Sequence, residues 1–246
     1  MIHRQRGLIL IGVATLVIGL IAMFPARVAY QWASAPLVSM RGIEGTIWRG
    51  SASEFGTNGV YLSNLTWQIK PFQLFTGKAA YVISGTPVSG FLDSEISISL
   101  GGKVTLRDLA ASLPLQMIER AANVPGLRGN ASLQFERLEL VGGRPAALDG
   151  TVDVANLVVP MLSRASLGGY RVEFFTQNNG IVASVEDTDG VIDLAGSLQI
   201  DLTGAYAFLG KVKAKPNTPE SITRQLKYLP PADESGQHEL RLEGSY

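Results

Sequence analysis

Few side chains of this 246-residue sequence could carry acid–base or nucleophilic chemistry. It has two histidines, His3 and His238, and no cysteine. A serine nucleophile needs a neighbouring base, usually histidine, to take its proton. His3 precedes a long apolar segment and His238 stands alone in an alternating pattern, so the two cannot share a site. The missing cysteines exclude thiolate zinc sites, iron–sulfur clusters and disulfides. The sequence therefore predicts neither an enzyme nor a bound cofactor or metal.

The densest group of acidic residues has a simpler interpretation than metal binding. It consists of Glu186, Asp187, Asp189 and Asp193. A calcium loop of the EF-hand type needs further ligands, a glutamate at its twelfth position and flanking helices, which this segment lacks. Because Asp189 precedes Gly190, the segment is typical of a tight hairpin turn.

The charge balance and the missing phosphate motifs exclude two further classes of ligand. The 21 basic and 21 acidic residues give a net charge of zero, and no basic stripe stands out. Nucleic acid is therefore not expected as a partner. The chain has no P-loop and no G-x-G-x-x-G that opens a helix, so nucleotide binding has no support.

The N-terminal residues predict a membrane anchor. Gly7–Phe24 is a run of 18 residues without a charge, just long enough to cross a hydrocarbon core as a helix. Arg4 and Arg6 precede it, and the first acidic residue is Glu44, so the N-terminus should remain in the cytoplasm. We expect residues 1–30 to form a cytoplasmic tip and a transmembrane anchor, and residues 31–246 to form an exported domain.

The residues that follow the apolar segment include two aromatic side chains and a candidate signal-peptidase site. Tyr30 and Trp32 are expected at the membrane interface, with Arg4 and Arg6 on the other side. Residues 33–35 have the small-x-small form of a signal-peptidase site, so a cleaved signal peptide is the alternative. The apolar run is longer than a usual signal-peptide core and Pro36 would follow the cut, which favours the anchor.

The rest of the chain predicts a mainly β fold. Apolar and polar residues alternate along many segments, as at Leu133 and Phe135, which places one face of each strand in a core. Asn58-Gly59, Asn179-Gly180 and Asp189-Gly190 are typical of hairpin turns. The sequence therefore predicts a curved antiparallel sheet. Strands are expected near 42–55, 60–70, 78–85, 90–106, 128–141, 146–157, 169–177, 180–187, 190–203, 204–213 and 236–244.

Two short helices are expected between these strands. Leu109, Leu113 and Met117 in 106–122 have a spacing of four, although Pro114 weakens this helix. Residues 219–229 begin with a proline at a first-turn position. A division of the domain into two lobes would fall near 107–127.

Several predicted strands share a loose repeat that contains a glycine. This repeat predicts a bent sheet, and two interpretations of its concave side remain open. The segments are 127–133, 148–154, 194–200 and, more weakly, 202–208. A glycine within a strand often marks a bend, and a bent sheet has a concave side. That side is either core covered by the helices or a second sheet, or an open apolar groove that holds acyl chains.

Particular motifs of the sequence resemble the type II secretion system protein N family. They are Phe24–Trp32 after an apolar anchor, Gly42–Ala52, Leu62–Trp67 before Pro71, residues 74–77 and the C-terminal pattern from Gly204 to Gly244. We single out five positions as structural or partner contacts: Gly45, Trp48, Arg49, Gly50 and Trp67. The two tryptophans are expected in consecutive strands.

The resemblance implies a bacterial inner-membrane protein with a β-rich periplasmic domain. It would act without enzymatic activity, as an accessory or scaffold of the machine that exports folded proteins, in contact with other secretion components. The alternative is a membrane-anchored β-groove protein that binds or transfers lipid in the periplasm.

Overall fold

A computed structural model describes residues 12–13, 15–33, 38–57, 60–119, 124–178 and 180–245. Residues 15–22 are helical and are followed by α2 (Ala26–Ala33). The strands are β1 (Val38–Arg41), β2 (Glu44–Gly45), β3 (Arg49–Thr57), β4 (Val60–Ile69), β5 (Lys78–Pro87), β6 (Phe91–Ser99), β7 (Val104–Pro114), β8 (Arg128–Val141), β9 (Arg144–Val158), β10 (Tyr170–Gln177), β11 (Gly180–Asp187), β12 (Ile192–Asp201), β13 (Ala205–Ala214) and β14 (His238–Ser245). Between them lie the 3₁₀ helices η1 (Pro71–Thr76) and η2 (Leu115–Ile118) and the α-helix α3 (Glu220–Leu226).

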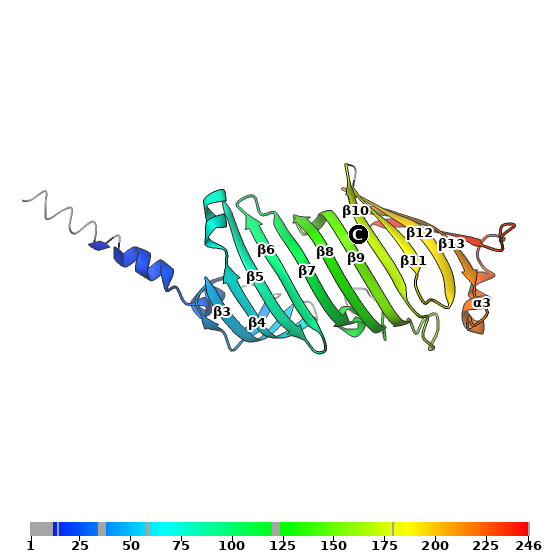
Figure 1. The fold of residues 1–246 in the computed structure, drawn as a ribbon, viewed down its shortest axis with the longest axis horizontal. Helices are drawn as coiled ribbons and strands as arrows, with labels where there is room; N and C mark the ends of the chain where they lie inside the picture. Colours follow the sequence, from blue (N-terminus) through cyan, green and yellow to red (C-terminus); the bar gives the residue numbers. More distant parts are fainter. Residues whose placement is uncertain are drawn as a thin grey trace, which may run out of the picture.

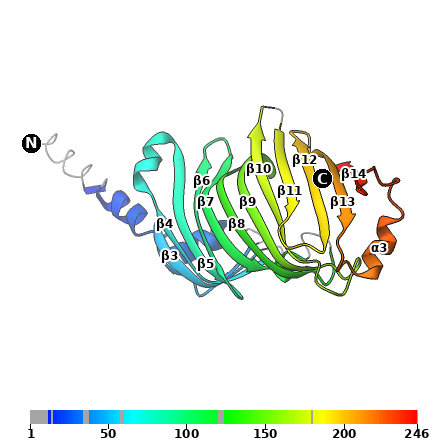
Figure 2. The ribbon, with the colours of Figure 1, turned by 45° about the vertical axis from the view of Figure 1, so that its right-hand side comes forward.

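All of these strands form one open antiparallel sheet, which confirms the predicted mainly β, antiparallel class. The order is β1-β3-β4 and then each strand beside the next to β14, with β2 paired to β3 (Figure 1). Figure 2 shows the curvature of the sheet. Neighbours in the chain are neighbours in the sheet because most connections are hairpins or short loops, although the connection from β13 to β14 is long and contains α3. The sheet is continuous through the described part of 107–127, where β7 pairs with both β6 and β8.

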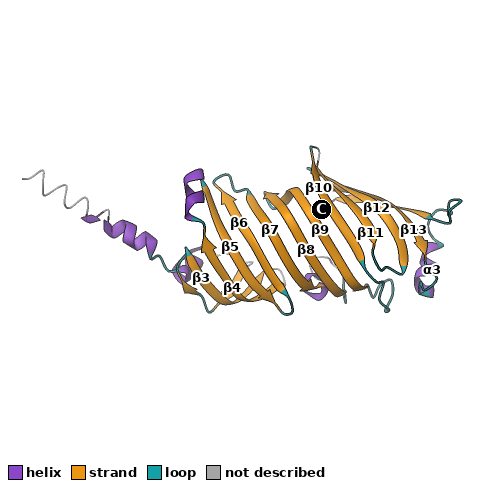
Figure 3. Cartoon of the chain, viewed as in Figure 1, coloured by secondary structure: helices purple, strands orange, loops and turns teal. Residues whose placement is uncertain are grey.

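Three predicted segments need correction. The first predicted helix, 106–122, is wrong over most of its length, because 104–114 is strand β7 and only Leu115–Ile118 form a short 3₁₀ helix. The second, 219–229, is confirmed by α3, and Figure 3 shows how few helices accompany the sheet. The predicted strand 42–55 is two strands, β2 and β3, separated by a turn at 46–48. The predicted strand 90–106 is likewise broken by a turn at 100–103.

Part of the predicted anchor lies outside the described residues. Residues 7–11 and 14 of Gly7–Phe24 are among these, as are Arg4, Arg6 and the candidate cleavage site around Ala35. In the portion that the structure describes, no helix is both long and apolar enough to span a bilayer.

Candidate functional site

One face of the sheet carries apolar side chains from β5 to β14. Residues directly opposite one another on neighbouring strands point to the same side, so a register row identifies a face. One such row is Gly85, Leu92, Ala111, Leu133, Val152, Val172, Val185, Gly196, Gly210 and Leu240. We call this side of the sheet the apolar face.

Phenylalanines of a second row on the apolar face lie against two glycines of the repeat, Gly150 and Gly196. Phe135 and Phe174 lie on either side of Gly150 and make an edge-to-face contact, with their ring centroids 6.1 Å apart. A Cβ on Gly150 would lie 2.8 Å from Cδ1 of Phe135. Phe208 likewise lies against Gly196 and Gly210, because a Cβ added to these glycines would lie 2.6 and 2.8 Å from its Cζ. The glycines therefore make room for aromatic rings.

Helices cover the apolar face towards its two ends, and between them Leu115 of η2 packs against Ala131 and Leu133 of β8. At the first end α2 packs over β4–β6 and leaves a pocket of about 380 Å³ with almost entirely apolar walls. Ala26, Ala29 and Tyr30 form one wall of this α2 pocket, and Trp67 and Ile83 are among the residues of the other. At the second end Ile222 and Leu226 of α3 pack near β10 and β12.

Between these ends, the apolar face is graded from buried to exposed. Phe135 is 8% exposed, whereas Leu242, at the end of the same row on β14, is 54% exposed. Leu133, Val152 and Phe174 are half-buried. The sheet therefore has a core in its middle and accessible apolar surface beyond it.

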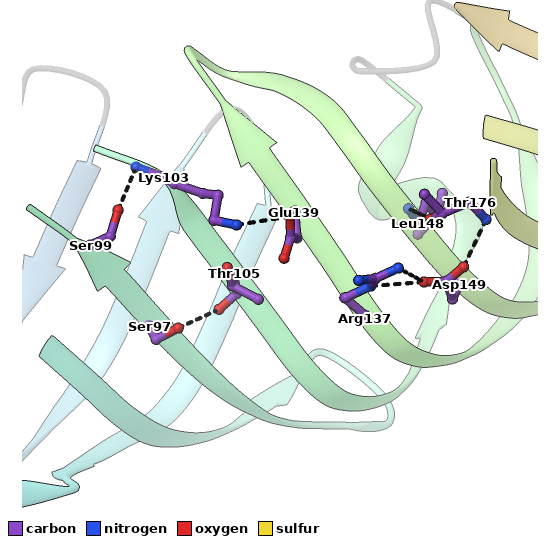
Figure 4. Close-up of polar contacts among 9 residues, drawn as sticks. All are labelled: Ser97, Ser99, Lys103, Thr105, Arg137, Glu139, Leu148, Asp149 and Thr176. Atoms are coloured by element: carbon purple, nitrogen blue, oxygen red, sulfur yellow. Dashed lines mark hydrogen bonds and ion pairs between the residues drawn. The ribbon is translucent and has the colours of Figure 1, made fainter. Parts of the chain in front are cut away.

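The opposite face is polar and carries ion pairs between strands (Figure 4). Lys103 pairs with Glu139 at 3.0 Å, and Arg137 pairs with Asp149 at 2.8 Å. Burial raises the pKa of Asp149, but hydrogen bonds from the Thr176 N–H and from Arg137 outweigh burial and hold that pKa below its usual value. These contacts join β7–β10 and fix the register of the sheet.

The acidic cluster predicted to form a hairpin turn lies between the end of β11 and the start of β12. Asp187 accepts a hydrogen bond from the backbone N–H of Leu194 and forms an ion pair with Lys215. Asp189 lies in the bend after β11. In the described part of the chain, no three His, Cys, Asp or Glu side chains are placed to hold a metal ion.

The turn between β2 and β3 is joined to the N-terminal helical segment by hydrogen bonds. The indole N–H of Trp48 donates to the carbonyl of Ile21 at 2.7 Å, and the backbone N–H of Ile47 donates to Phe24 at 3.1 Å. The indole N–H of Trp67 donates to the carbonyl of Thr46 at 3.0 Å. We call residues 21–25 and 46–48 together with Trp67 the anchor junction.

The five positions singled out from the sequence lie in or beside this anchor junction. Trp48 is in the turn and not in a strand, so the prediction of two tryptophans in consecutive strands is wrong for it. Gly45 has a φ of +84°, and its Cβ would lie 2.5 Å from the carbonyl oxygen of Arg49. A Cβ on Gly50 would lie 2.5 Å from Cζ2 of Trp67. Both glycines therefore allow the turn to close.

Tyr30 and Trp32, the predicted interface residues, have different surroundings. The hydroxyl of Tyr30 donates to the carbonyl of Val38 at 2.9 Å and accepts from the N–H of Met40 at 3.2 Å. Trp32 is 74% exposed, and its ring lies 5.4 Å from that of Phe24. Their role at a membrane interface stays a prediction.

The sequence analysis missed α2 as an element that packs on the sheet. Residues 1–30 were expected to be tip and anchor, yet Ala26, Tyr30 and their neighbours cover the apolar face. Apolar residues at spacings of three and four, Ala26, Ala29, Tyr30 and Ala33, are the signal that could have identified this short amphipathic helix.

Comparison with known proteins places the chain in a family. The family model described as type II secretion system (T2SS), protein N matches residues 36–241. The chain is 22% identical over 235 residues to the type II secretion system protein N of Aeromonas hydrophila, with 92% of each chain covered. It is 23% identical over 252 residues to that of Vibrio cholerae serotype O1, with 98% of each covered. No solved structure gives a significant match. The chain belongs to the type II secretion system protein N family.

Proposed function

We propose that the chain is a non-enzymatic accessory of the type II secretion machine. Gly7–Phe24 holds it in the bacterial inner membrane, the N-terminus remains in the cytoplasm, and residues 31–246 lie in the periplasm. The β domain works by its position and contacts other secretion components. Family membership supports the link to secretion, and the 18-residue uncharged segment supports the anchoring.

The anchor junction is the observation that carries this proposal furthest. A flexible tether would leave the sheet free to turn, but the hydrogen bonds from Trp48 and Ile47 reach the end of the N-terminal helical segment. A domain held in one orientation to its anchor can present the same edge and face to its partners. This arrangement suits a scaffold.

The surroundings of the exported histidine also support a non-enzymatic role. The Nδ1 of His238 lies 2.8 Å from the carbonyl oxygen of Pro230. In the described ranges, no hydroxyl or carboxylate side chain makes a hydrogen bond with this imidazole. A base that activates a nucleophile needs such a bond.

The direct test is secretion by a strain that lacks the gene and is complemented with variants of the full chain. We expect wild-type chain to restore export of type II substrates, and Trp48→Phe/Trp67→Phe to restore it only in part. Trp32→Phe is the matched control, because the Trp32 ring is exposed and lies outside the junction bonds. Normal export without the gene would refute the proposal. An inactive alkaline phosphatase fused after residue 246 would refute the orientation, because this enzyme needs disulfides that form in the periplasm and not in the cytoplasm.

Lipid binding is a second candidate, and the apolar face is the observation that favours it. The α2 pocket of about 380 Å³ is in the size range of small-ligand sites, and its walls are apolar. An acyl chain bound in the pocket would remove these walls from water.

Lipids that co-purify with the full chain would distinguish the two candidates. We expect mass spectrometry of the extract to find bound phospholipid with the wild type and less with Ala29→Trp, which fills the α2 pocket from the helix. Val82→Trp, on the polar side of β5, is the control. Equal lipid in all three proteins would contradict a role for the pocket.

A further inference from the structure

The segment between β4 and β5 exposes large apolar side chains. Within η1, Phe72 is 83% and Phe75 is 89% exposed. Leu100, in the turn between β6 and β7, is 94% exposed, and its Cδ1 lies 3.5 Å from the position of a Cβ on Gly77, at the end of η1. We call Phe72, Leu74, Phe75 and Leu100 the apolar tip. Exposed apolar residues that gather in this way mark an interaction site.

The fold holds the apolar tip in a fixed orientation. Gln73 donates a side-chain hydrogen bond of 2.8 Å to Glu95, and Lys70 forms an ion pair with the same carboxylate. At the other end of η1, Gly77 adopts a left-handed φ of +73° and its N–H bonds to the carbonyl of Leu74 at 3.0 Å. The polar side chain of η1 therefore faces the sheet, and its two phenylalanines face outward.

The apolar tip lies close to the end of the N-terminal helical segment. The N–H of Ile69 bonds to the carbonyl of Trp48 at 2.7 Å, and Trp48 bonds to Ile21 through its indole. η1 begins two residues after Ile69. Figures 1 and 2 show η1 at the same end of the sheet as the N-terminal segment, and α3 at the opposite end.

Three lysines lie beside the apolar tip, and two of them are neutralised by ion pairs, Lys70 with Glu95 and Lys103 with Glu139. Lys78 follows Gly77, is exposed, and forms no ion pair with any residue that the structure describes. The tip therefore combines aromatic rings with a positive charge, the combination that suits an anionic membrane surface.

We propose that the apolar tip inserts into the lipid headgroup region of the membrane that the N-terminal segment crosses. Phe72 and Phe75 reach the boundary of the acyl chains, and Lys78 lies among the phosphates. The domain then meets the bilayer at two points, which sets the angle at which the sheet leaves the membrane. This inference rests on the proposed anchoring.

A single fluorescent label on the full chain tests the insertion. The chain has no cysteine, so Phe75→Cys gives one labelling site for a nitrobenzoxadiazole dye without other changes. The labelled protein is reconstituted in vesicles of phosphatidylethanolamine and phosphatidylglycerol that carry a nitroxide quencher near the headgroup. Tyr228→Cys, exposed just after α3, is the control far from the membrane, and Ile18→Cys is the control within the anchor.

We expect the label at position 75 to lose most of its fluorescence to the nitroxide and to shift to the blue, and the label at 228 to do neither. Quenching at 18 without quenching at 75 would overturn the apolar tip as a membrane contact and leave the anchoring intact. The absence of quenching at 18 would overturn the anchoring itself. A blue shift at 75 that needs other secretion components and comes without quenching would assign the tip to a protein partner and overturn the lipid contact.

Discussion

The indole N–H of Trp48 donates a 2.7 Å hydrogen bond to the backbone carbonyl of Ile21, 27 residues earlier in the chain. Ile21 is in the last turn of a helix that ends at residue 22, and its carbonyl also accepts a backbone bond of 3.3 Å from the Phe24 N–H. The indole of Trp48, in the β2–β3 turn, is thus a second and shorter hydrogen-bond donor to the end of the N-terminal helical segment. This bond ties the end of the N-terminal helical segment at Ile21 to the sheet.

Loss of that bond should loosen the anchor junction. We expect Trp48→Phe, which keeps a ring but removes the donor, to weaken the junction by about 1 kcal/mol. Hydrogen exchange at the Ile47 amide should then be about fivefold faster, since that amide bonds to Phe24. Trp32→Phe should leave this rate unchanged. Equal exchange rates in wild type and Trp48→Phe would show that the bond does not hold the junction.

Gly50 should tolerate no larger residue. A Cβ there would lie 2.4 Å from the carbonyl oxygen of Glu44 and 2.5 Å from the Trp67 ring, so Gly50→Ala must push the β2–β3 turn apart. We expect the free energy of unfolding to fall by about 1–3 kcal/mol, as in overpacked cores. Gly101→Ala is the control, because its nearest neighbour would be 3.9 Å away. Urea denaturation of both variants measures the difference, and equal midpoints would contradict the packing.

The buried middle and the exposed end of one row on the apolar face should differ in their contribution to stability. Phe135→Ala removes a buried ring that contacts Phe174 and should cost about 3–5 kcal/mol. Leu242→Ala, at the exposed end, should cost less than about 1 kcal/mol because little apolar area is buried there. Thermal unfolding followed by circular dichroism checks both values. Similar losses would mean that the face is covered along its whole length.

The Asp149 carboxylate should stabilise the sheet at neutral pH and lose this effect in acid. Its pKa in the folded protein is below the ordinary 3.8, so its contribution is present above 3.8 and disappears as the pH falls through the native pKa. We expect Asp149→Asn to lower the free energy of unfolding by about 1 kcal/mol at pH 7, and by less below pH 3.8.

Denaturation at several pH values measures this dependence. Glu54→Gln is the control, because the Arg41–Glu54 pair is exposed and should contribute less than about 0.5 kcal/mol. An Asp149→Asn effect that is constant from neutral to acidic pH would assign it to packing rather than to charge.

Alternation along the strands made most of the sheet predictable, and an ambiguous spacing explains the main error. Leu109 and Leu113 are four residues apart, a spacing that places two side chains on one face of a helix and also on one face of a strand. Within β7 they lie opposite Phe135 and Ala131, so both belong to the apolar face of the sheet. The same spacing continues to Met117, which is why 106–122 was expected to be helical.

The anchor junction could be predicted only in part. Gly45, Gly50 and Trp67 attract attention through their types, but the partner of each tryptophan is a backbone carbonyl, at Ile21 and at Thr46. Backbone carbonyls leave no mark in a sequence, and their positions follow only from the folded chain. The same limit applies to the apolar tip, because Phe72 and Phe75 look like core residues until the sheet leaves them outside.

Purification of the intact secretion machine tests the central claim most directly. The full chain, tagged at its C-terminus and expressed from its own locus, is isolated from solubilised envelopes, and the co-purifying proteins are quantified. We expect other type II secretion components to accompany it in a constant ratio and to be reduced by Trp48→Phe/Trp67→Phe. Their reproducible absence, together with unchanged secretion in a strain without the gene, would contradict the account.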